Sequence, residues 1–370
     1  MICEKKKCTG CFACYNICPQ DAIVMQEDRC GYMYPVINSN ICVNCGLCKR
    51  ICPNNTVIEK KYPIMCYAAK SKDSEVLLKS TSGGIATCLT KLFLKGNNVV
   101  YGASYNNCFE VEHTRISRND DVEKIQGSKY AQSNINLSYR RVKEDLKNGK
   151  KVLFVGTPCQ IAGLKSFIKK GHDRLYLVDI VCHGVPSNKF LKDELIRLCD
   201  ISKILNVKYR KGNEYSFTIY KNDGTIMEYN KDESPYLDAF FERISLRESC
   251  YSCNYARPER ISDMTLGDFW GLTDKSFFNS EEHISLILIN SEKGKELFNM
   301  VKGEIDYQIR DVDEAINGNS QLKKPSVKHE KADRFKQIYP KKGFYRAYKK
   351  VSFIKRYKKR IKNIIKGLIG

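Results

Sequence analysis

The spacing of apolar and polar residues changes near residue 60 of the chain. Before this point, residues 22–26 and 34–38 read as two short strands around a turn at Gly31. Beyond it, apolar runs of strand type alternate with helical stretches, which predicts an α/β sheet with functional loops at the carboxyl ends of its strands. The expected strands are 64–69, 98–105, 111–117, 151–155, 175–181, a hairpin within 206–229 around a turn at 223–224, a strand within 261–272 and a last strand at 286–290. The expected helices are 80–94, 135–147, 161–170, 189–199, 236–244 and 293–301.

Residues 341–370 follow a third pattern. Apolar side chains recur there at steps of three or four with Lys or Arg between them, which predicts a basic amphipathic helix. The chain has a net charge of +21, and this segment holds 12 of its 63 Lys and Arg residues and no acidic residue. The helix could dock on its own domain or lie on an anionic membrane surface, where each nearby Lys or Arg contributes ~1 kcal/mol. Nucleic-acid binding is less favoured, because no recognised module accompanies the charge.

Length and composition indicate a folded protein of more than one domain. The chain has 370 residues, of which 42% are hydrophobic, and this is ample for a sizeable core. We expect three parts, at residues 1–60, 61–340 and 341–370. The chain shows no signal-type apolar run and no run of ~18 apolar residues, and its 18 cysteines fall in cluster spacing rather than in a disulfide framework. We therefore expect a cytoplasmic protein, with a peripheral position at the inner face of the membrane as the alternative that the last segment allows.

The most informative motif is a comb of cysteines that occurs twice. Residues 8–19 read C-T-G-C-F-A-C-Y-N-I-C-P and residues 42–53 read C-V-N-C-G-L-C-K-R-I-C-P. This C-x2-C-x2-C-x3-C-P spacing is the signature of bacterial ferredoxins, in which the fourth cysteine of each comb ligates the other cluster. The predicted ligands of one [4Fe–4S] cluster are Cys8, Cys11, Cys14 and Cys52, and those of the second are Cys42, Cys45, Cys48 and Cys18. Zinc is the alternative, but two complete combs that each end in Cys-Pro make it improbable.

Four further cysteines lie in the second part of the chain. Cys159 and Cys182 directly follow apolar strands in Gly/Pro-rich loops, and Cys250 and Cys253 form a CxxC pair. Taken from spacing alone, the four could hold a third [4Fe–4S] cluster. Buried thiols and a redox dithiol fit equally well. The remaining cysteines are expected to be ordinary packed or surface thiols; they are Cys3, Cys30, Cys66, Cys88, Cys108 and Cys199.

A small-residue segment, T-S-G-G at 81–84, leads straight into an expected helix. Small residues allow backbone N–H groups and the helix dipole to approach a phosphate, although a helix cap without a ligand is equally natural. No G-x-G-x-x-G or Walker sequence occurs, so neither a Rossmann dinucleotide site nor a P-loop is supported.

Six motifs in order carry a resemblance to a known family. They are T-S-G-G-I at 81–85, G-S-K-Y-A-Q-S at 127–133, G-T-P-C-Q-I-A-G-L at 156–164, C-H-G-V-P-S at 182–187, C-Y-S-C-N-Y-A-R at 250–257 and T-L-G-D-F-W-G at 265–271. Together they resemble the coenzyme F420 hydrogenase/dehydrogenase beta-subunit family, over about residues 63–325, with a ferredoxin module fused in front. The family's relatives include deazaflavin-oxidising subunits, 7-hydroxymethyl chlorophyll a reductase and proteins associated with polysaccharide biosynthesis.

The resemblance implies a bound FAD next to a [4Fe–4S] cluster. It makes Cys159, Cys182, Cys250 and Cys253 the expected ligands of that cluster. It also implies a set of residues at the FAD, namely Ser82, Gly83, Gly84, Ser128, Lys129, Tyr130, Gln132 and Asp268. Lys129 is expected to stabilise negative charge on a reduced flavin or a pyrophosphate, and His183 is expected to relay protons. The alternatives without a catalytic role are a solvated lysine and a structural histidine.

The predicted function is therefore an iron–sulfur flavoprotein oxidoreductase. It would relay electrons between three [4Fe–4S] clusters and an FAD, exchange them with a ferredoxin or another redox partner, and reduce or oxidise a small molecule. One alternative is an electron-transfer subunit without its own substrate, with a link to polysaccharide biosynthesis. A second alternative is a membrane-surface or nucleic-acid-binding protein whose clusters are structural. Neither the substrate nor the use of a deazaflavin follows from the residues.

Overall fold

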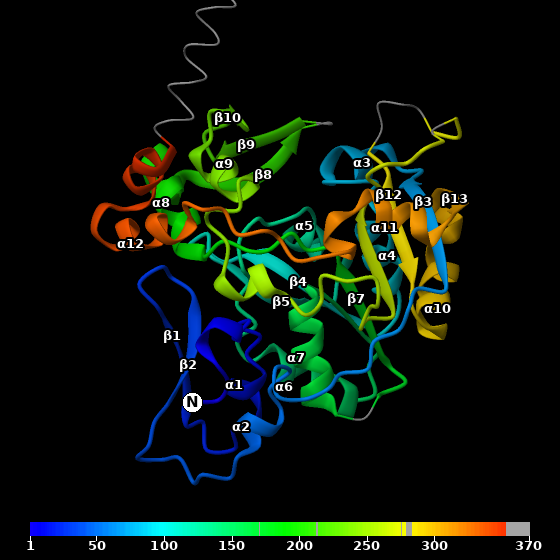
Figure 1. Cartoon of the computed structure of the whole chain (residues 1–370). Coiled ribbons are helices and arrows are strands. Elements are labelled where there is room, and N and C mark those ends of the chain that lie inside the picture. The colour runs from blue at the N-terminus through cyan, green and yellow to red at the C-terminus, as the bar shows by residue number, and fades with distance from the viewer. Residues whose placement is uncertain (170, 212–213, 275, 279–282, 353–370) are drawn as a thin grey trace, which may run out of the picture.

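The computed structural model describes residues 1–352 except residues 170, 212–213, 275 and 279–282 (Figure 1). The predicted helical tail falls largely on residues 353–370, which lie outside the described residues. Six short 3-10 turns complement the helices and strands of the described chain. They are η1 (Lys5–Lys7), η2 (Asn119–Asp121), η3 (Ile201–Lys203), η4 (Glu248–Ser252), η5 (Lys302–Glu304) and η6 (Ser320–Leu322).

The first 60 residues, called the cysteine module below, form a small unit beside the rest of the chain (Figure 1). Its elements are α1 (Ala13–Ile17), β1 (Ile23–Glu27), β2 (Met33–Ile37) and α2 (Leu47–Arg50). The two strands pair antiparallel, so that Ile23 lies opposite Ile37. Both predicted strands of the module are confirmed to within one residue.

An eight-stranded mixed sheet forms the centre of the rest of the chain, in the order β13-β3-β12-β11-β7-β6-β4-β5. Its strands are β3 (Met65–Ser71), β4 (Val99–Tyr105), β5 (Val111–Ile116), β6 (Val152–Gly156), β7 (Leu175–Ile180), β11 (Met264–Asp268), β12 (Ser285–Ile289) and β13 (Ile305–Arg310). Strands β4, β6, β7 and β11 run parallel, and the pairs outside them are antiparallel. The predicted last strand at 286–290 is wrong in one respect, because β13 follows it and pairs with β3.

Helices cover both faces of this sheet. One face packs Val100, Leu153 and Val178 against α4 (Ile85–Phe93) and α10 (Glu292–Val301). The other face packs Val99 and Phe154 against the helices α6 (Ser138–Lys147) and α7 (Pro158–Ile168). The same apolar cluster includes residues of the cysteine module, among them Cys11, Phe12 and Ala13. The module is therefore docked on the α6–α7 layer through a shared core.

A second, three-stranded sheet closes the remaining side of the molecule. It consists of β8 (Ile204–Lys211), β9 (Glu214–Lys221) and β10 (Ile226–Asn230), and it lies with α8 (Asn188–Leu198), α9 (Pro235–Phe241) and α12 (Ala332–Lys342). The hairpin predicted around Asp223–Gly224 is confirmed, because this turn joins β9 to β10. The prediction missed a third strand, since β8 pairs with the other edge of β9. The other helices are α3 (Ser74–Lys79), α5 (Val122–Ile125) and α11 (Val312–Gly318).

The described beginning of the tail packs on the protein itself. Residues 344–352 are helical, and the side chains of Phe344, Tyr348 and Val351 are buried. The ring of Phe344 lies 5.5 Å from that of Phe190 and 5.8 Å from that of Tyr236. This part of the tail therefore belongs to the core around α8.

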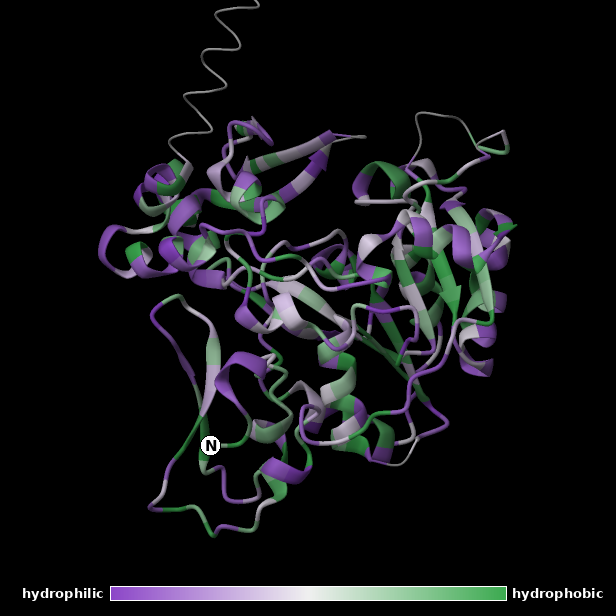
Figure 2. Cartoon of the chain, viewed as in Figure 1, coloured by the Kyte–Doolittle hydropathy of each residue, from purple (hydrophilic) through white to green (hydrophobic). Residues whose placement is uncertain are grey.

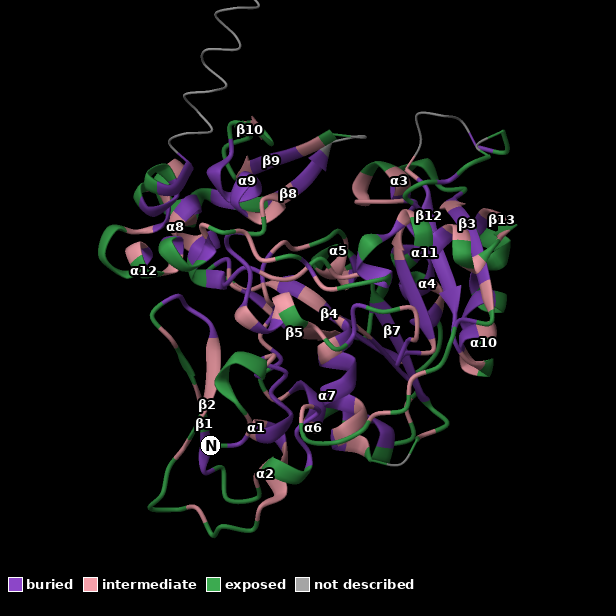
Figure 3. Cartoon of the chain, in the orientation of Figure 1, coloured by how far each residue is buried: buried purple, intermediate pink, exposed green. Residues whose placement is uncertain are grey.

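Burial follows hydropathy across the molecule. The central strands are apolar in Figure 2 and buried in Figure 3, as is most of α7. The loop that leads into α2, in contrast, is exposed at the far end of the cysteine module (Figure 3). Within the described residues, no helix combines the length and the apolar character needed to cross a bilayer.

Candidate functional site

The two cysteine combs share the same backbone geometry. In the first comb, Gly10 and Phe12 have φ values of +63° and +61°. In the second, Asn44 and Gly46 occupy the equivalent positions and have φ values of +53° and +72°. Left-handed residues at these two positions wrap the chain tightly between successive cysteines. Phe12 and Asn44 therefore adopt the left-handed conformation even though they are not glycines.

The first cysteine set lies on the inner side of the module. Cys8, Cys11, Cys14 and Cys52 line one small cavity and are buried. Burial, followed by the charges of Cys8, Cys52 and Cys159, raises the pKa of Cys11 to about 12. Cys3, which the sequence indicated to be an ordinary thiol, lines the same cavity, and its hydrogen bond is the main cause that lowers the pKa of Cys8 to about 6.

The second cysteine set lies at the outer end of the module. Cys45 is exposed there, and Cys18, Cys42 and Cys48 are half-buried. The charges of Cys18 and Cys42 act on Cys48, so the fourth cysteine of the first comb lies beside the second comb. The fold thus brings Cys18 to the second set and Cys52 to the first, as the crossed ligand pattern requires.

The third cysteine set is assembled from segments far apart in the sequence. Cys159 stands at the start of α7, Cys182 follows β7, and Cys250 and Cys253 lie in and just after η4. Because β6 and β7 are parallel neighbours, their carboxyl ends bring the first two together. The four thiols line one cavity of about 350 Å³. Burial, and then the charges of Cys250 and Cys159, raises the pKa of Cys182.

The arrangement of donors fits clusters better than single ions. In the part of the chain that the structure describes, no three His, Cys, Asp or Glu side chains converge closely enough to hold one metal ion. A tetrahedral zinc site requires sulfur atoms at ~2.3 Å from a common point. The first set instead lines a small cavity and the third set lines part of the large one, and such space beside the thiols suits a cubane. The donor chemistry, four cysteines without a histidine, is also that of [4Fe–4S] sites.

The first set lies next to the third. The charge of Cys159 acts on Cys11, and the charges of both cysteines act on Tyr139 and Tyr255, so these two rings lie near both sets. Tyr139 is fully buried and Tyr255 almost so. No sequence pattern indicated this proximity, because the two cysteines are separated by the whole of β3 to β6.

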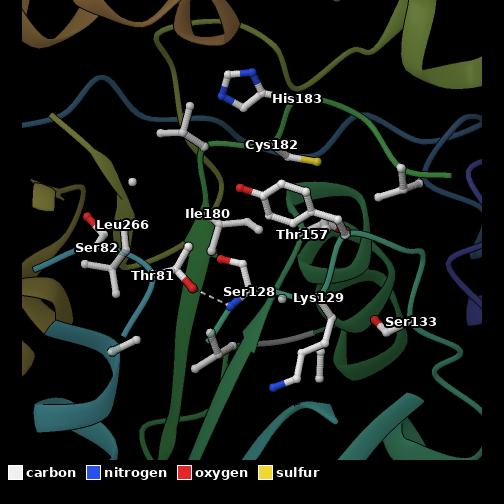
Figure 4. Close-up of a pocket in the computed structure, with 18 of the residues that line it drawn as sticks. Thr81, Ser82, Ser128, Lys129, Ser133, Thr157, Ile180, Cys182, His183 and Leu266 are labelled. Atoms are coloured by element: carbon white, nitrogen blue, oxygen red, sulfur yellow. Dashed lines mark hydrogen bonds between the residues drawn. The ribbon is translucent and has the colours of Figure 1, made fainter. Parts of the chain in front are cut away.

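The predicted phosphate segment lines the same cavity as the third set. Ser82 and Gly84 contribute to its wall, at the start of α4. A Cβ at Gly83 would lie 2.5 Å from the carbonyl oxygen of Ala69, so only glycine fits there. The backbone N–H of Ser128 donates to Thr81 Oγ1 at 2.8 Å and joins this segment to the second motif (Figure 4).

The two residues predicted to be catalytic have different surroundings. His183 is exposed on the cavity wall beside Cys182 (Figure 4). The ammonium of Lys129 points away from His183 and Cys182 (Figure 4). It donates to the carbonyl oxygens of Lys124, Gln126 and Gly127 at 3.2, 2.8 and 3.2 Å. Burial lowers the pKa of Lys129 to about 7. Both catalytic roles stay predictions.

Three further predicted residues line the cavity. Tyr130 stacks on Tyr209, with 4.6 Å between the ring centroids. Gln132 donates to the carbonyl oxygen of Thr9 at 2.8 Å and thereby links the main domain to the cysteine module. Asp268 forms a two-point ion pair with Arg210, at 2.6 and 3.1 Å.

Sequence reasoning missed the two arginines of this site. Arg210 comes from β8 and reaches the far wall of the cavity, where it pairs with Asp268. Arg247 is buried between the cysteine module and the third cysteine set. A single arginine three residues before a cysteine, as in R-E-S-C, carries no recognised pattern, so no sequence signal could have identified Arg247.

Fold and cysteine geometry together define an iron–sulfur protein of the dicluster type. Residues 7–56 match the 4Fe-4S dicluster domain, which supports two [4Fe–4S] clusters in the cysteine module. Residues 149–315 match the family described as the C terminus of the coenzyme F420 hydrogenase/dehydrogenase beta subunit. Over these residues the chain matches the coenzyme F420 hydrogenase/dehydrogenase beta-subunit family, and the resemblance carried by its motifs is confirmed.

Two known proteins show what the chain is similar to. The F subunit of the F(420)H(2) dehydrogenase of Methanosarcina mazei is 25% identical over 250 residues, which are 65% of this chain and 63% of that relative. The chain thus spans less than two thirds of that relative's length. A chain of the F420-reducing [NiFe] hydrogenase complex from Methanosarcina barkeri is 18% identical, with 72% of this chain and 94% of that chain covered and a TM-score of 0.47.

Proposed function

We propose that this protein is an oxidoreductase that passes electrons between its clusters and an FAD held in the large cavity, and thereby reduces or oxidises a small molecule. One observation carries the proposal. The third cysteine set and the segments around Ser82 and Ser128 line a single cavity, and Cys159 of that set adjoins Cys11 of the cysteine module. The relationship to a subunit of F(420)H(2) dehydrogenase supports an activity of this class.

The residues divide the cavity into two ends. Cys159, Cys182, Cys250 and Cys253 would hold a third [4Fe–4S] cluster at the end nearest the cysteine module. At the other end, the start of α4 presents N–H groups and a positive helix end, which suit the FAD phosphates. When bound, clusters carry one electron at a time and a flavin carries two, so such a pairing interconverts the two kinds of transfer.

The chain's own contribution would be to hold these groups close together and exclude water. Tyr139 and Tyr255, both buried beside Cys11 and Cys159, would help to exclude water there. The cavity wall beyond His183 is aromatic and includes Tyr215 and Phe240, which would contact a flat substrate or the flavin itself. Lys129 would act through the backbone carbonyls that it holds, and His183 is placed to exchange a proton at the cavity wall.

A second candidate function is that of an electron-transfer subunit without its own substrate. The relative from M. mazei is itself named a subunit, and Cys45 is exposed at the outer end of the cysteine module. A ferredoxin or a partner subunit would exchange electrons there with the second cluster. The isolated protein separates the two candidates: turnover of an added acceptor with reduced ferredoxin supports an oxidoreductase, and FAD binding without turnover of any acceptor supports a relay subunit.

The test of the main proposal is the cofactor content of anaerobically purified protein. We expect about twelve iron atoms, in three four-iron clusters, and about one FAD per chain. Cys182→Ser should remove about four iron atoms, whereas Cys108→Ser, which changes an exposed cysteine outside the three sets, should remove none. About eight iron atoms without flavin in the wild type would leave only the dicluster module and contradict the proposal. Reduced ferredoxin, NAD(P)H and the reduced deazaflavin are the donors to titrate in turn.

The proposed membrane contact concerns the tail alone. Residues 353–370 carry the Lys and Arg that would face anionic lipid. Chains that end at residue 352 and full-length chains should then differ in binding to vesicles with anionic lipid, and equal binding by both would contradict this contact.

A further inference from the structure

Arg247 is the most deeply buried charge at the boundary between the cysteine module and the main domain. Only 1% of the surface of Arg247 is exposed. Nε donates to the carbonyl oxygen of Cys8 at 2.8 Å, Nη1 to Oε1 of Gln132 at 2.9 Å and Nη2 to the carbonyl oxygen of Met33 at 2.8 Å. The guanidinium also lies 4.4 Å from the ring centroid of Tyr34. Its hydrogen bonds are therefore satisfied by neutral groups.

The counter-charge of Arg247 is not a carboxylate. No carboxylate of the described residues lies within ion-pair distance of it, whereas the other two most buried arginines each have one. Arg260 pairs with Asp179 at 2.7 Å, and Arg210 pairs with Asp268 at 2.6 Å. A charge removed from water must be compensated by an opposite charge nearby. The nearest group that can supply this compensation is the sulfur of Cys8, a predicted cluster ligand.

Predicted cluster ligands lie on both sides of this guanidinium. Nη2 is 3.9 Å from Sγ of Cys8, in the first cysteine set. Arg247 also lines the large cavity together with Cys159 and Cys250, in the third set. The backbone N–H of Cys250 donates to the carbonyl oxygen of Arg247 at 3.0 Å. A thiolate-ligated [4Fe–4S] cluster has a net negative charge, which grows when the cluster is reduced, and its potential depends on nearby charges. An anionic cluster on either side would supply the missing counter-charge.

We propose that Arg247 is a counter-cation shared by the cluster at Cys8 and the cluster at Cys250, and that it raises the reduction potentials of both. The part that concerns Cys250 rests on the proposed function, whereas the part that concerns Cys8 needs only the dicluster module. Arg247 is a positioning residue in this scheme. It remains protonated, and no bond forms or breaks. An electron that moves from one cluster to the other leaves the total charge around Arg247 unchanged, so the transfer does not require the removal of its counter-charge.

The test is a redox titration of the full-length, anaerobically prepared holoprotein, followed by electron paramagnetic resonance. Arg247→Met removes the charge and keeps much of the bulk, and Arg247→Lys keeps the charge but not the three-point bonding. Arg140→Met is the matched control. Arg140 donates to the carbonyl oxygen of Cys18, a predicted ligand of the second cluster, at 2.8 Å, but its side chain is 35% exposed and paired with Asp21.

Arg247→Met should lower the equilibrium constant for reduction of each adjacent cluster by about tenfold, which is a shift of about −59 mV for one electron. Arg247→Lys should shift either potential by less than half as much. Arg140→Met should leave all potentials unchanged, because its charge is already paired and partly screened by water.

The outcomes separate this inference from the proposed function. Unchanged potentials in Arg247→Met with all clusters bound would overturn the inference. If Arg247→Met does not retain its clusters, Arg247→Lys decides: a full tenfold change with the charge still present would overturn it, and near-normal potentials would support it. A wild-type protein with only about eight iron atoms would contradict the proposed function, yet the cluster at Cys8 would still test Arg247.

Discussion

The contact between α7 and the cysteine module leads to the sharpest prediction, because it leaves no room for one methyl group. Gly163 lies in α7, against Cys11 of the module. A Cβ there would lie 2.8 Å from Oη of Tyr139, 3.0 Å from Cβ of Cys11 and 3.2 Å from Sγ of Cys11. Neither neighbour can move freely. Tyr139 is buried and donates to the carbonyl oxygen of Gln160 at 2.8 Å, and Cys11 is a predicted cluster ligand.

Two opposing effects determine the magnitude for Gly163→Ala. In a helix without neighbours, alanine is more stable than glycine by ~0.5–1 kcal/mol. An extra methyl group in a packed core costs ~1–3 kcal/mol, because side chains and backbone must shift. We expect the steric effect to win, with a net loss of ~1–2 kcal/mol and a fall in the iron content of the first cluster. The thermal midpoint should fall by ~2–4 °C per kcal/mol or somewhat less in a chain of this size.

The assay compares thermal unfolding and iron content of anaerobic wild type, Gly163→Ala and Gly303→Ala. Gly303 is the control, because a Cβ there would meet nothing within 4 Å, so its substitution should change stability by less than ~0.5 kcal/mol. A Gly163→Ala protein that is as stable as the wild type and holds the same iron would refute the tight approach of the module to α7.

Three other predictions follow from buried side chains. Burial lowers the pKa of His113 to about 4. Between that pH and the ordinary value of ~6.5, the unfolded chain binds a proton that the folded chain does not, so stability should fall by up to ~3 kcal/mol as the pH drops through this window, and His113→Gln should flatten the profile. Asp268→Asn leaves Arg210 buried without its ion pair and should cost ~2–4 kcal/mol, measured by denaturant unfolding. Phe344→Ala removes a fully buried ring and should cost ~3–5 kcal/mol, with faster hydrogen exchange in α8.

Each of these has a result that contradicts it. A wild-type pH profile that His113→Gln does not change would show that this imidazole does not titrate as its burial requires. Asp268→Asn with unchanged stability would mean that Arg210 finds another anion. Phe344→Ala with unchanged exchange would mean that the beginning of the tail contributes nothing to the core, and Phe277→Ala, at a half-exposed ring, serves as the matched control.

The local chemistry of this protein could be predicted from its sequence. The cysteine combs are local patterns, in which ligand spacing and the following proline are fixed within about a dozen residues, and they led directly to the dicluster module. The apolar run that became β6 was equally clear, because a strand buried on both faces is continuously apolar. The order of six short motifs led to the family. The predicted FAD, by contrast, stays a prediction.

Only the tertiary structure decided what lies next to what. β13 reads as an ordinary amphipathic segment with polar residues at alternate positions, and its place at the sheet edge depends on pairing with β3, more than 200 residues earlier. The neighbourhood of Cys11 and Cys159 arises from α1 packing on α7, and the burial of Arg247 from two parts of the chain closing over it. Such contacts depend on long-range packing and on shared charge, and neither leaves a periodic trace in a sequence. The cysteine motifs can therefore be read from short stretches of the sequence, whereas the proximity of the three cysteine sets is established only by the folded structure.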